Sequence, residues 1–382
     1  MAFFHSGFIA FCKESYSTLR WYFYYGWKMS AICLYHKGRE TQKKYGISLF
    51  KQFTSLINLS LLHNITPVKY YKYRFYLTEN RGKELDYFYT FELPHFHIVS
   101  NKGNQHLDKA RKFIADKTSF TEALKKFDIP HVPTILNTSN VKNPDISIFF
   151  REEDIFCKPN NGSQSKDAFR VRYIREENRY ELHPINGNPV TCSTEVAAFL
   201  KEKLKSCNDL ILQHFIRDHS EIKALADSEQ SITLRIITAQ FNDRSVKPVY
   251  MQLEIPDIQK NSKQFYKIYP LTLKTFEVTP IFKSMGLTEN IKDPHLSDSI
   301  KLMLSQSLDL CVYAHSKLIA LKSVAFDLFI TNEGPLIIEA NFNWDIEMLY
   351  NHPHKNIREL LPEEWLKNKN NANTTLTKKI EN

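Results

Sequence analysis

The stretch Ser323–Asp345 constrains the fold of this chain more than any other, because it has the pattern of a β-hairpin. Val324–Ile330 is apolar except at one position. Thr331–Gly334 follows, with residue types that tolerate a positive φ and form turns. Pro335–Ala340 is again apolar except at one position. The pattern predicts two antiparallel strands joined by a tight turn.

The two exceptions are the acids Asp327 and Glu339. They are equidistant from Glu333, so a hairpin centred there sets them across from each other. Side chains alternate along a strand, so Glu339 and Asn341 share a face. Two carboxylates inside an apolar strand pair repel each other and lose hydration unless a cation joins them. Such oxygen ligands suit Mg²⁺, with phosphate and water completing the coordination. The alternative is an exposed edge hairpin whose acids face water.

Composition bounds the class of protein. The chain has 382 residues, enough for two to three domains at about 150 residues each. None of the six Cys forms a C-x-x-C pair, so no zinc site or disulfide framework is predicted, and a reducing, cytoplasmic setting is expected. The apolar N-terminus lacks the features of a signal peptide, and no stretch reaches the ~18 apolar residues of a membrane-spanning helix.

The net charge is positive, because Lys and Arg exceed Asp and Glu by 9. Such a surplus can suit ATP, sugar phosphates, a membrane surface or nucleic acid. Basic residues occur along the whole chain, however, and a soluble basic surface is the simpler interpretation. The recognised nucleic-acid-binding modules are absent, so no nucleic-acid partner is expected.

Residues 1–105 are expected to form a helical, aromatic-rich region. Basic residues stand among its Trp and Tyr residues up to about residue 65. This helical layer either packs on the next domain or touches a membrane surface or an acceptor. Runs of Tyr and Lys between 67 and 97 predict short strands or an aromatic-rich cap. At the other end, the Asn- and Lys-rich residues 366–382 are expected to be disordered.

Helix and strand patterns alternate from residue 106 onwards. The predicted helices are 120–127, 196–204 and 297–320. The predicted strands are 148–150, 155–157, 169–173, 210–216 and 232–239.

Three further segments carry candidate chemistry. Lys158 ends a strand before a polar loop, which either closes over phosphates or is an ordinary polar hairpin. The apolar strand Leu210–Ile216 runs into a polar segment, as an interdomain linker that reads an adenine edge can do. Arg235 interrupts a β-branched run and needs an anionic partner, either a core carboxylate or a nucleotide phosphate. His352 and His354 are expected to be surface residues rather than metal ligands.

Taken in order, these residues resemble the ATP-grasp superfamily, and most of all its sugar-transfer-associated branch, found near polysaccharide genes in bacteria. The similarity spans residues 106–350. It is carried by the ordered set Asp116-Lys117, Lys158-Pro159 with Gly162-Ser163, Leu212-Gln213 followed by Ile216, Thr233-Leu-Arg235, Asp327 and Glu339-x-Asn341. The resemblance implies an α+β ATP-grasp fold, in which a small subdomain at 106–216 and a C-terminal subdomain at 217–365 clasp ATP.

The resemblance also implies a role for each matched residue. The implied ATP ligands are Lys117, Lys158, Gly162, Ser163 and Arg235 for the phosphates, Gln213, Phe215 and Ile216 for adenine, and Glu221 for ribose, with Lys158 also near the base. The implied Mg²⁺ ligands are Asp327, Glu339 and Asn341. Lys158 and Arg235 are the candidate catalytic residues, because phosphoryl transfer depends on positioning and charge neutralisation.

Two departures from the family pattern bear on activity. Ser165 and Asp167 stand where glycine is usual in the phosphate loop, which disfavours close backbone approach to phosphates, and Asp167 adds a like charge unless it points away. Ala325 stands where some peptide-forming relatives have an Arg that aids the acyl phosphate. Lys322 and Arg235 are the candidate substitutes.

The expected function is an ATP- and Mg²⁺-dependent ligase. It would activate a carboxylate as an acyl phosphate for attack by an amine or hydroxyl, in capsule or cell-surface polysaccharide modification. One alternative is an ATP-grasp kinase of small molecules. Another is a catalytically weak, nucleotide-binding scaffold in polysaccharide assembly. The expected location is cytoplasmic, with peripheral membrane or polysaccharide-machinery contact through the N-terminal region as a variant.

Overall fold

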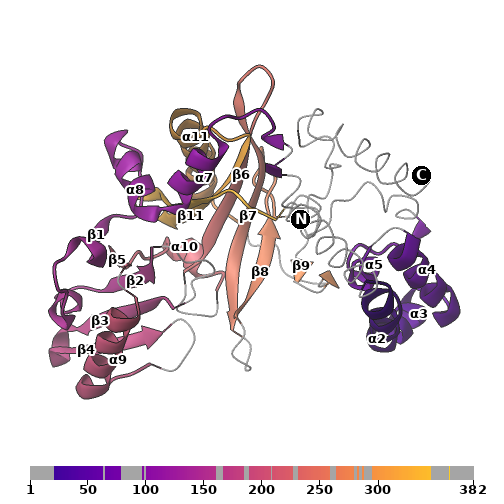
Figure 1. The fold of residues 1–382 in the computed structure, drawn as a ribbon, viewed down its shortest axis with the longest axis horizontal. Coiled ribbons are helices and arrows are strands. Elements are labelled where there is room, and N and C mark those ends of the chain that lie inside the picture. Colours follow the sequence, from indigo (N-terminus) through magenta and orange to yellow (C-terminus); the bar gives the residue numbers. More distant parts are fainter. Residues whose placement is uncertain are drawn as a thin grey trace, which may run out of the picture. The chain divides into compact units, whose positions relative to one another are not determined.

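The computed structural model describes residues 21–62, 65–78, 97–98, 100–160, 167–184, 189–207, 209–226, 231–258, 264–278, 282–283, 286–287, 295–345 and 361. The chain divides into two compact units. The N-terminal unit comprises Met1–Glu92 and Met285–Leu287, and the larger unit comprises the rest of the chain. Figure 1 follows the elements of each unit along the sequence.

Helices build the N-terminal unit. One helical run, with α- and π-helical turns, extends without a break through η1 (Trp21–Met29), α2 (Ser30–Cys33), η2 (Leu34–Gly38) and α3 (Arg39–Tyr45). Within the described residues of this unit, the other elements are α4 (Leu49–Leu62), α5 (Pro67–Lys72) and the short strand β10 (Gly286–Leu287). Gly38 lets the run approach α4 closely, because a Cβ there would lie 2.8 Å from side-chain atoms of Leu34 and Leu49. The helical prediction up to residue 65 is confirmed over 21–62.

The strands predicted between 67 and 97 are wrong at Pro67–Lys72, which forms helix α5. Pro67 stands at the start of this helix, where its missing N–H costs no hydrogen bond and its fixed φ suits helical geometry. Tyr70 then points inward and is only 2% exposed. The predicted run Tyr87–Phe91 lies outside the described residues.

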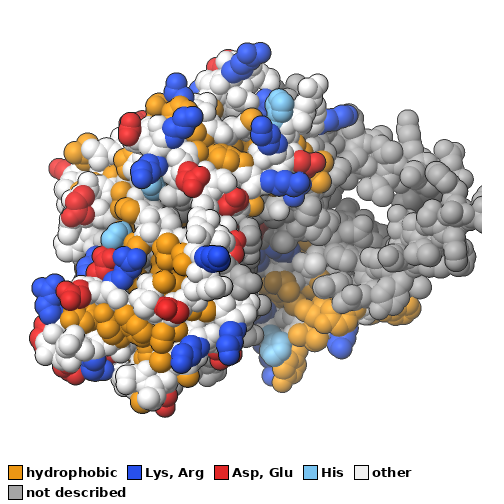
Figure 2. All heavy atoms as spheres, turned by 60° about the vertical axis from the view of Figure 1, so that its left-hand side comes forward, with side chains coloured by type: hydrophobic (Ala, Val, Ile, Leu, Met, Phe, Trp, Pro, Cys, Tyr) orange, Lys and Arg blue, Asp and Glu red, His pale blue; other side chains and the backbone are white. Residues whose placement is uncertain are grey.

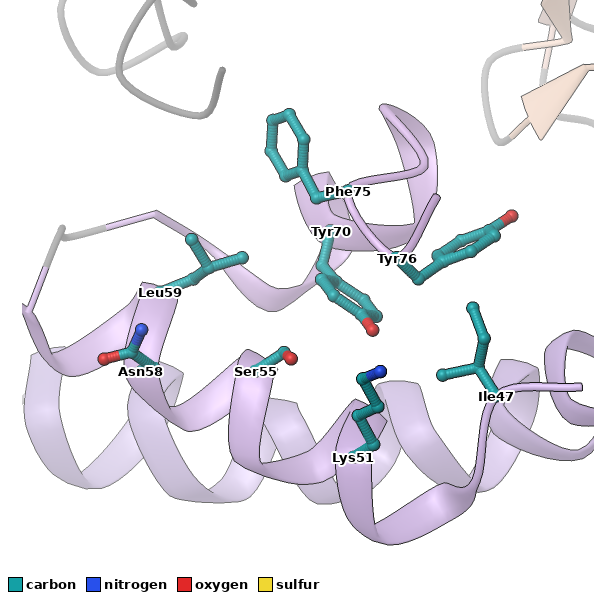
Figure 3. Close-up of a pocket in the computed structure, with 8 residues that line it drawn as sticks. All are labelled: Ile47, Lys51, Ser55, Asn58, Leu59, Tyr70, Phe75 and Tyr76. Carbon is teal, nitrogen blue, oxygen red and sulfur yellow. The ribbon is translucent and has the colours of Figure 1, made fainter. Parts of the chain in front are cut away.

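A pocket of about 160 Å³ lies in the N-terminal unit. Figure 3 shows Ser55 and Lys51 on α4 below the ring of Tyr70, which points down towards them. The lining residues are Ile47, Lys51, Ser55, Asn58, Leu59, Tyr70, Phe75 and Tyr76. None of the residues predicted to bind ATP or Mg²⁺ lines this pocket.

The larger unit contains an antiparallel sheet with the order β9-β8-β7-β6-β11-β12 within the unit. Its strands are β6 (Thr233–Gln240), β7 (Val246–Ile258), β8 (Gln264–Pro270), β9 (Phe282–Lys283), β11 (Ser323–Thr331) and β12 (Gly334–Asn341). The long helix α11 (Asp298–Leu318) packs on β7, β6, β11 and β12 (Figure 1). It buries Ile300, Leu304, Leu308 and Cys311, so the helical spacing predicted for 297–320 is confirmed.

A second sheet of five strands has the order β1-β5-β2-β3-β4. Its strands are β1 (Thr134–Asn137), β2 (Ile155–Pro159), β3 (Phe169–Ile174), β4 (Arg179–Pro184) and β5 (Leu210–His214). Helix α9 (Ser193–Ser206) packs on this sheet, and the two share a separate hydrophobic core. The two sheets and their helices make the larger unit an α+β structure, as predicted.

One predicted strand is wrong. The residues 148–150 belong mostly to a 3₁₀ turn, Ile146–Phe149. Asp145 starts that turn, because its carboxylate accepts a hydrogen bond from the backbone N–H of Ser147 at 2.8 Å, and such an Asx turn competes with extended structure. Phe149 is nevertheless fully buried, so the apolar run marks a core contact.

Two helices, α7 (Leu107–Ala115) and α8 (Lys117–Lys126), lead from the start of the larger unit towards the second sheet. The segment after α8 is tied to the hairpin, because the backbone N–H of Val132 donates to the carbonyl of Ile337 at 3.0 Å. Within the ranges that the structure describes, no helix is long and apolar enough to cross a membrane.

Candidate functional site

The hairpin pairs its two acids as predicted. β11 and β12 are antiparallel, and Asp327 is the register partner of Glu339, with an irregularity directly after Asp327. On its other side β11 pairs with β6, where Asp327 faces Arg235. Asp327 is therefore on an interior strand and only 6% exposed. The alternative of an exposed edge hairpin does not hold for this acid.

Arg235 bridges two carboxylates. Its Nε and Nη2 donate to Oδ1 and Oδ2 of Asp327 at 2.7 and 2.9 Å, and its Nη1 lies 2.8 Å from Oε1 of Glu254. Burial opposes the charge, but the two carboxylates outweigh it and raise the pKa of Arg235 above its ordinary value. Without a ligand, the anionic partner that this Arg needs is therefore a pair of core carboxylates.

Asn341 joins the two acids of the hairpin. Its Nδ2 donates to Oδ2 of Asp327 and to Oε1 of Glu339, each at 3.2 Å. The other oxygen of Glu339 lies 3.7 Å from Nζ of Lys117. Two carboxylate oxygens from neighbouring strands thus converge on one amide group.

This donor set fits Mg²⁺. The ion prefers carboxylate and amide oxygens, and an amide can present either its nitrogen or its oxygen by rotation. Among the described residues, no three His, Cys, Asp or Glu side chains are placed to hold a metal together. In the predicted set of Asp327, Glu339 and Asn341 the third protein ligand would be the Asn341 amide, which stays a prediction.

Lys117 is held in place by the start of α8. Asp116 caps this helix by accepting hydrogen bonds from the backbone N–H groups of Thr118 and Ser119 at 3.1 and 3.4 Å. Lys117 then donates from Nζ to the carbonyl of Asn160 at 3.1 Å. The Asn160 side chain donates in turn to Asp116 at 3.2 Å, so the residue after β2 and the start of α8 are locked together.

Lys158, on β2, faces the same group of charges. Burial lowers the pKa of Lys158 to about 8, against the attraction of Glu339 and Asp327 and with the repulsion of Lys117. Among the described residues, no carboxylate lies within 4.0 Å of its ammonium group. Lys158 is thus a cation that an incoming anion can neutralise without breaking an ion pair.

Six charged side chains therefore form one cluster, and we call it the charged cluster. It contains three cations and three carboxylates: Lys117, Lys158, Arg235, Glu254, Asp327 and Glu339. The formal charges of the cluster balance, and it offers both anionic and cationic groups to a ligand.

The residues predicted to bind adenine and ribose each have hydrogen-bond partners of their own. The Gln213 amide faces β1, 3.4 Å from the carbonyl of Val132. The backbone N–H of Phe215 donates to the carbonyl of Asp154 at 3.0 Å, and the guanidinium of Arg170 lies 3.8 Å from the centre of its ring. The carbonyl of Ile216 accepts a long 3.5 Å hydrogen bond from Ser231.

Glu221 has a partner at the start of α11, because it accepts a hydrogen bond from the backbone N–H of Ser297 at 2.6 Å. Among the described residues, Gln213, Phe215, Ile216 and Glu221 share no hydrogen bond or ion pair with the charged cluster. Their predicted roles therefore stay predictions.

Of the residues singled out in the predicted phosphate loop, only Asp167 belongs to the described part of the chain. Gly162, Ser163 and Ser165 lie outside the described residues. Asp167 is exposed and forms an ion pair with Lys203 of α9 at 2.9 Å, so this charge is directed at a helix surface. Asp167 has φ +64, the region in which glycine is favoured.

Ala325, which stands in place of an Arg, is fully buried and lies two residues before Asp327 on the same strand. Of the two candidate substitutes for that Arg, Arg235 contacts Asp327 directly. His352 and His354 lie outside the described residues.

Glu254 is not among the residues predicted from the sequence to form the site, although the sequence pattern of its strand could have indicated it. Gln252 and Glu254 interrupt the apolar pattern of β7 at alternate positions, as Asp327 interrupts β11. The structure shows them in one buried chain, in which Tyr250 donates to Gln252 at 2.7 Å and Gln252 donates to Glu254 at 2.6 Å.

The chain was compared with protein families, with curated proteins and with solved structures. No protein-family model matches the sequence, and no curated protein matches it. Solved structures that match include D-alanyl-alanine synthetase A from Vibrio cholerae, with TM-score 0.40 and 17% identity over 68% of this chain and 66% of that one. Another is the ATP-grasp ligase PsnB, with TM-score 0.35 and 13% identity over 63% and 55%. N5-carboxyaminoimidazole synthase from Aspergillus clavatus, bound to ADP, has TM-score 0.36 and 12% identity over 61% and 46%.

The chain spans about half the length of the first solved structures that it matches. At TM-scores of 0.35 to 0.40 the likeness is too low to assign an activity. The functional conclusion therefore rests on the charged cluster and on Asn341.

Proposed function

We propose that the charged cluster binds the triphosphate of ATP together with Mg²⁺, and that the protein is an ATP-dependent ligase of the ATP-grasp type. The observation that carries the proposal is the meeting of Asp327, Glu339 and Asn341 with the cations Lys117, Lys158 and Arg235. Acids of this kind are costly inside a sheet unless cations join them, and three separate elements supply those cations.

Each residue then has a defined task. Asp327, Glu339 and Asn341 would hold Mg²⁺, which, when bound, neutralises charge on the phosphates and orients them. Lys158 and Lys117 bind phosphate oxygens from the side of β2 and α8. Arg235 would exchange its contact with Asp327 for one with the transferring phosphoryl group and would keep its ion pair with Glu254.

The reaction that this arrangement suits is phosphoryl transfer to a carboxylate. An oxygen of the substrate carboxylate attacks the γ-phosphorus, the bond to the β,γ-bridging oxygen breaks, and ADP leaves. An amine or hydroxyl then attacks the acyl phosphate, loses its proton and displaces inorganic phosphate. The cationic side chains stabilise the charge that develops in the first step.

The substrates that we propose are glycan-linked or small carboxylates with an amine or hydroxyl acceptor, because the matched motifs resemble the sugar-transfer-associated branch. A kinase and a weakly active scaffold differ from this ligase in their products. We therefore propose to incubate the protein with ATP, Mg²⁺ and panels of acids and amines.

ADP plus free phosphate that depends on both substrates supports the ligase. ADP with a phosphorylated product supports the kinase instead, and tight ATP binding without turnover supports the scaffold.

The metal assignment has its own test. Glu339→Gln removes one charge but keeps the size and the hydrogen bond to Asn341, so the protein should fold normally and lose at least 100-fold in ADP formation, on the order of 3 kcal/mol. Lys125→Ala, at an exposed position at the end of α8, is the matched control. Near-normal ADP formation by Glu339→Gln would remove Glu339 from the site.

A further inference from the structure

The helical run from Trp21 to Tyr45 carries large apolar side chains on its exposed side. Of the side chains in this run whose burial the structure describes (23, 24 and 26–45), the buried ones are small or polar: Gly26, Ser30, Gly38 and Thr41. Phe23, Trp27 and Tyr35 are instead 72%, 53% and 82% exposed. Soluble helices normally show the opposite pattern, so this face is built to meet something other than water.

The exposed residues are arranged in a row. Every fourth position of the run, from 23 to 43, is exposed, and we call this the outer row: Phe23, Trp27, Ala31, Tyr35, Arg39 and Lys43. Residues four apart lie on one face of a helix. Aromatic side chains fill the first part of the row and basic side chains the last part.

Residues next to the outer row are also aromatic, apolar or basic, and exposed. Tyr24, Lys28 and Ile32 are also exposed, and the ammonium group of Lys28 lies 5.3 Å from the centre of the Tyr24 ring. The patch therefore combines aromatic rings with ammonium groups.

The charge of the chain is concentrated in the same unit. The N-terminal unit, Met1–Glu92 with Met285–Leu287, contains 13 Lys and Arg but only 6 Asp and Glu, a surplus of 7, and the surplus of the whole chain is 9. The larger unit therefore has a surplus of only 2. In Figure 2, basic and acidic side chains are interspersed over the face shown.

We propose that the outer row docks the protein on an anionic lipid surface. Trp and Tyr are the side chains that settle at the level of lipid headgroups, and Lys and Arg are attracted by anionic lipids. The excess positive charge favours an acidic surface over a neutral one. The proposal is independent of the ATP site, whose residues all belong to the larger unit.

The test is co-sedimentation of the full chain with vesicles of phosphatidylcholine alone or with 30% phosphatidylglycerol. We expect binding to the anionic vesicles only, weakening as salt is raised. Arg39→Gln/Lys43→Gln should lower the partition coefficient about 25-fold, since each cation near such a surface contributes about fivefold. Trp27→Ser/Tyr35→Ser should lower it at least tenfold, since partitioning of apolar area drives the insertion.

Matched controls separate docking from general stickiness. Lys125→Gln/Lys126→Gln and Leu302→Ser/Tyr313→Ser change exposed residues of the same types in the larger unit, and both should bind like the parent. Circular dichroism confirms that each variant is folded. Equal binding by parent and outer-row variants overturns the proposal, as does absence of binding to anionic vesicles. Retention on duplex DNA but not on vesicles also overturns it, in favour of a nucleic-acid partner.

Discussion

At the scale of single residues, the charged cluster is held together by interactions that a nucleotide has to replace. The guanidinium group of Arg235 forms ion pairs with both Asp327 and Glu254. Lys158 has no such ion pair among the described residues, and burial lowers its pKa to about 8. Lys158 is therefore the cation that phosphate can engage at the least cost.

Lys158→Ala should for this reason weaken ATP binding. A hydrogen bond to a charged group contributes about 1.5–3 kcal/mol, so the dissociation constant measured by calorimetry should rise by about 10-fold to 100-fold. Lys125→Ala, exposed at the end of α8, serves as the control. An unchanged dissociation constant for Lys158→Ala would place this lysine outside the site.

Glu254→Gln should reveal a positioning role. Without the Glu254 carboxylate, Arg235 has only Asp327 as an anionic partner and competes with Mg²⁺ for it. The Mg²⁺ concentration needed for half-maximal ADP formation should rise about tenfold, while ATP binding without Mg²⁺ stays within about twofold. Glu254→Asp should restore part of the Mg²⁺ response. A loss of ATP binding and Mg²⁺ response by the same factor would indicate a general structural defect instead.

The sequence predicts the pairing of Asp327 with Glu339, because an acid in an apolar strand has few explanations. The turn alone does not set this pairing: Thr331 pairs with Gly334, and the irregularity after Asp327 brings Glu339 rather than Ile338 opposite it. Asn160 could not be predicted in the same way. Its contacts with Lys117 and Asp116 join segments more than forty residues apart, and nothing in its local pattern indicates them.

At the scale of elements, the interface between α11 and the larger sheet contains a buried imidazole. His315 is 1% exposed, and its Nε2 donates to the carbonyl of Leu321 at 2.8 Å while Nδ1 lies 2.7 Å from the hydroxyl of Thr238. Burial lowers the pKa of His315 to about 4. The neutral form is therefore part of the folded state.

Acid should destabilise the protein through this residue. The folded-state pKa lies below that of an unfolded histidine, about 6.5, so the stabilisation is complete above that value and is lost as the pH falls towards 4. Between these limits the free energy of unfolding should fall by at most about 1.4 kcal/mol per pH unit for this group. The urea midpoint at pH 7 and pH 5 measures the effect.

His315→Gln keeps a polar group of similar reach and removes the titration. The variant should be less stable than the parent at pH 7, but its midpoint should depend less on pH. His97, whose pKa burial also lowers to about 4, leaves part of the dependence in place. An identical pH dependence in parent and variant would contradict the assignment to His315.

Elements with strong local signals are predicted correctly. The 3.6-residue spacing of Ile300, Leu304, Leu308 and Cys311 identifies α11, and the β-branched run around Arg235 identifies β6. β7 and β8 are not predicted, because their polar residues interrupt the apolar pattern and their pairing is fixed by neighbours in the sheet. The aromatic run at Pro67–Lys72 suits a strand by composition but starts with a helix-initiating proline.

At the scale of the whole molecule, the proposed site draws on both sheets of the larger unit. Lys158 lies on β2, and Arg235, Asp327 and Glu339 lie on β6, β11 and β12. A ligand that binds to all of them stabilises the folded unit as one body. The residues of the proposed site come from segments that are far apart in the sequence. For this reason the composition of the chain alone does not indicate a nucleotide site.

ATP with Mg²⁺ should therefore raise the melting temperature of the full-length protein. At a ligand concentration of 100 times the dissociation constant, binding adds about 2.7 kcal/mol to the stability, which corresponds to a shift of roughly 5 °C for a unit of this size. Chelation of Mg²⁺ should remove most of the shift, because Asp327 and Glu339 then repel the triphosphate. Glu339→Gln should show the same small shift with and without Mg²⁺, whereas an outer-row variant such as Arg39→Gln/Lys43→Gln should respond like the parent. A full shift in Glu339→Gln would mean that the nucleotide binds away from the charged cluster, and the ligase proposal would fall while the lipid-docking proposal would stand.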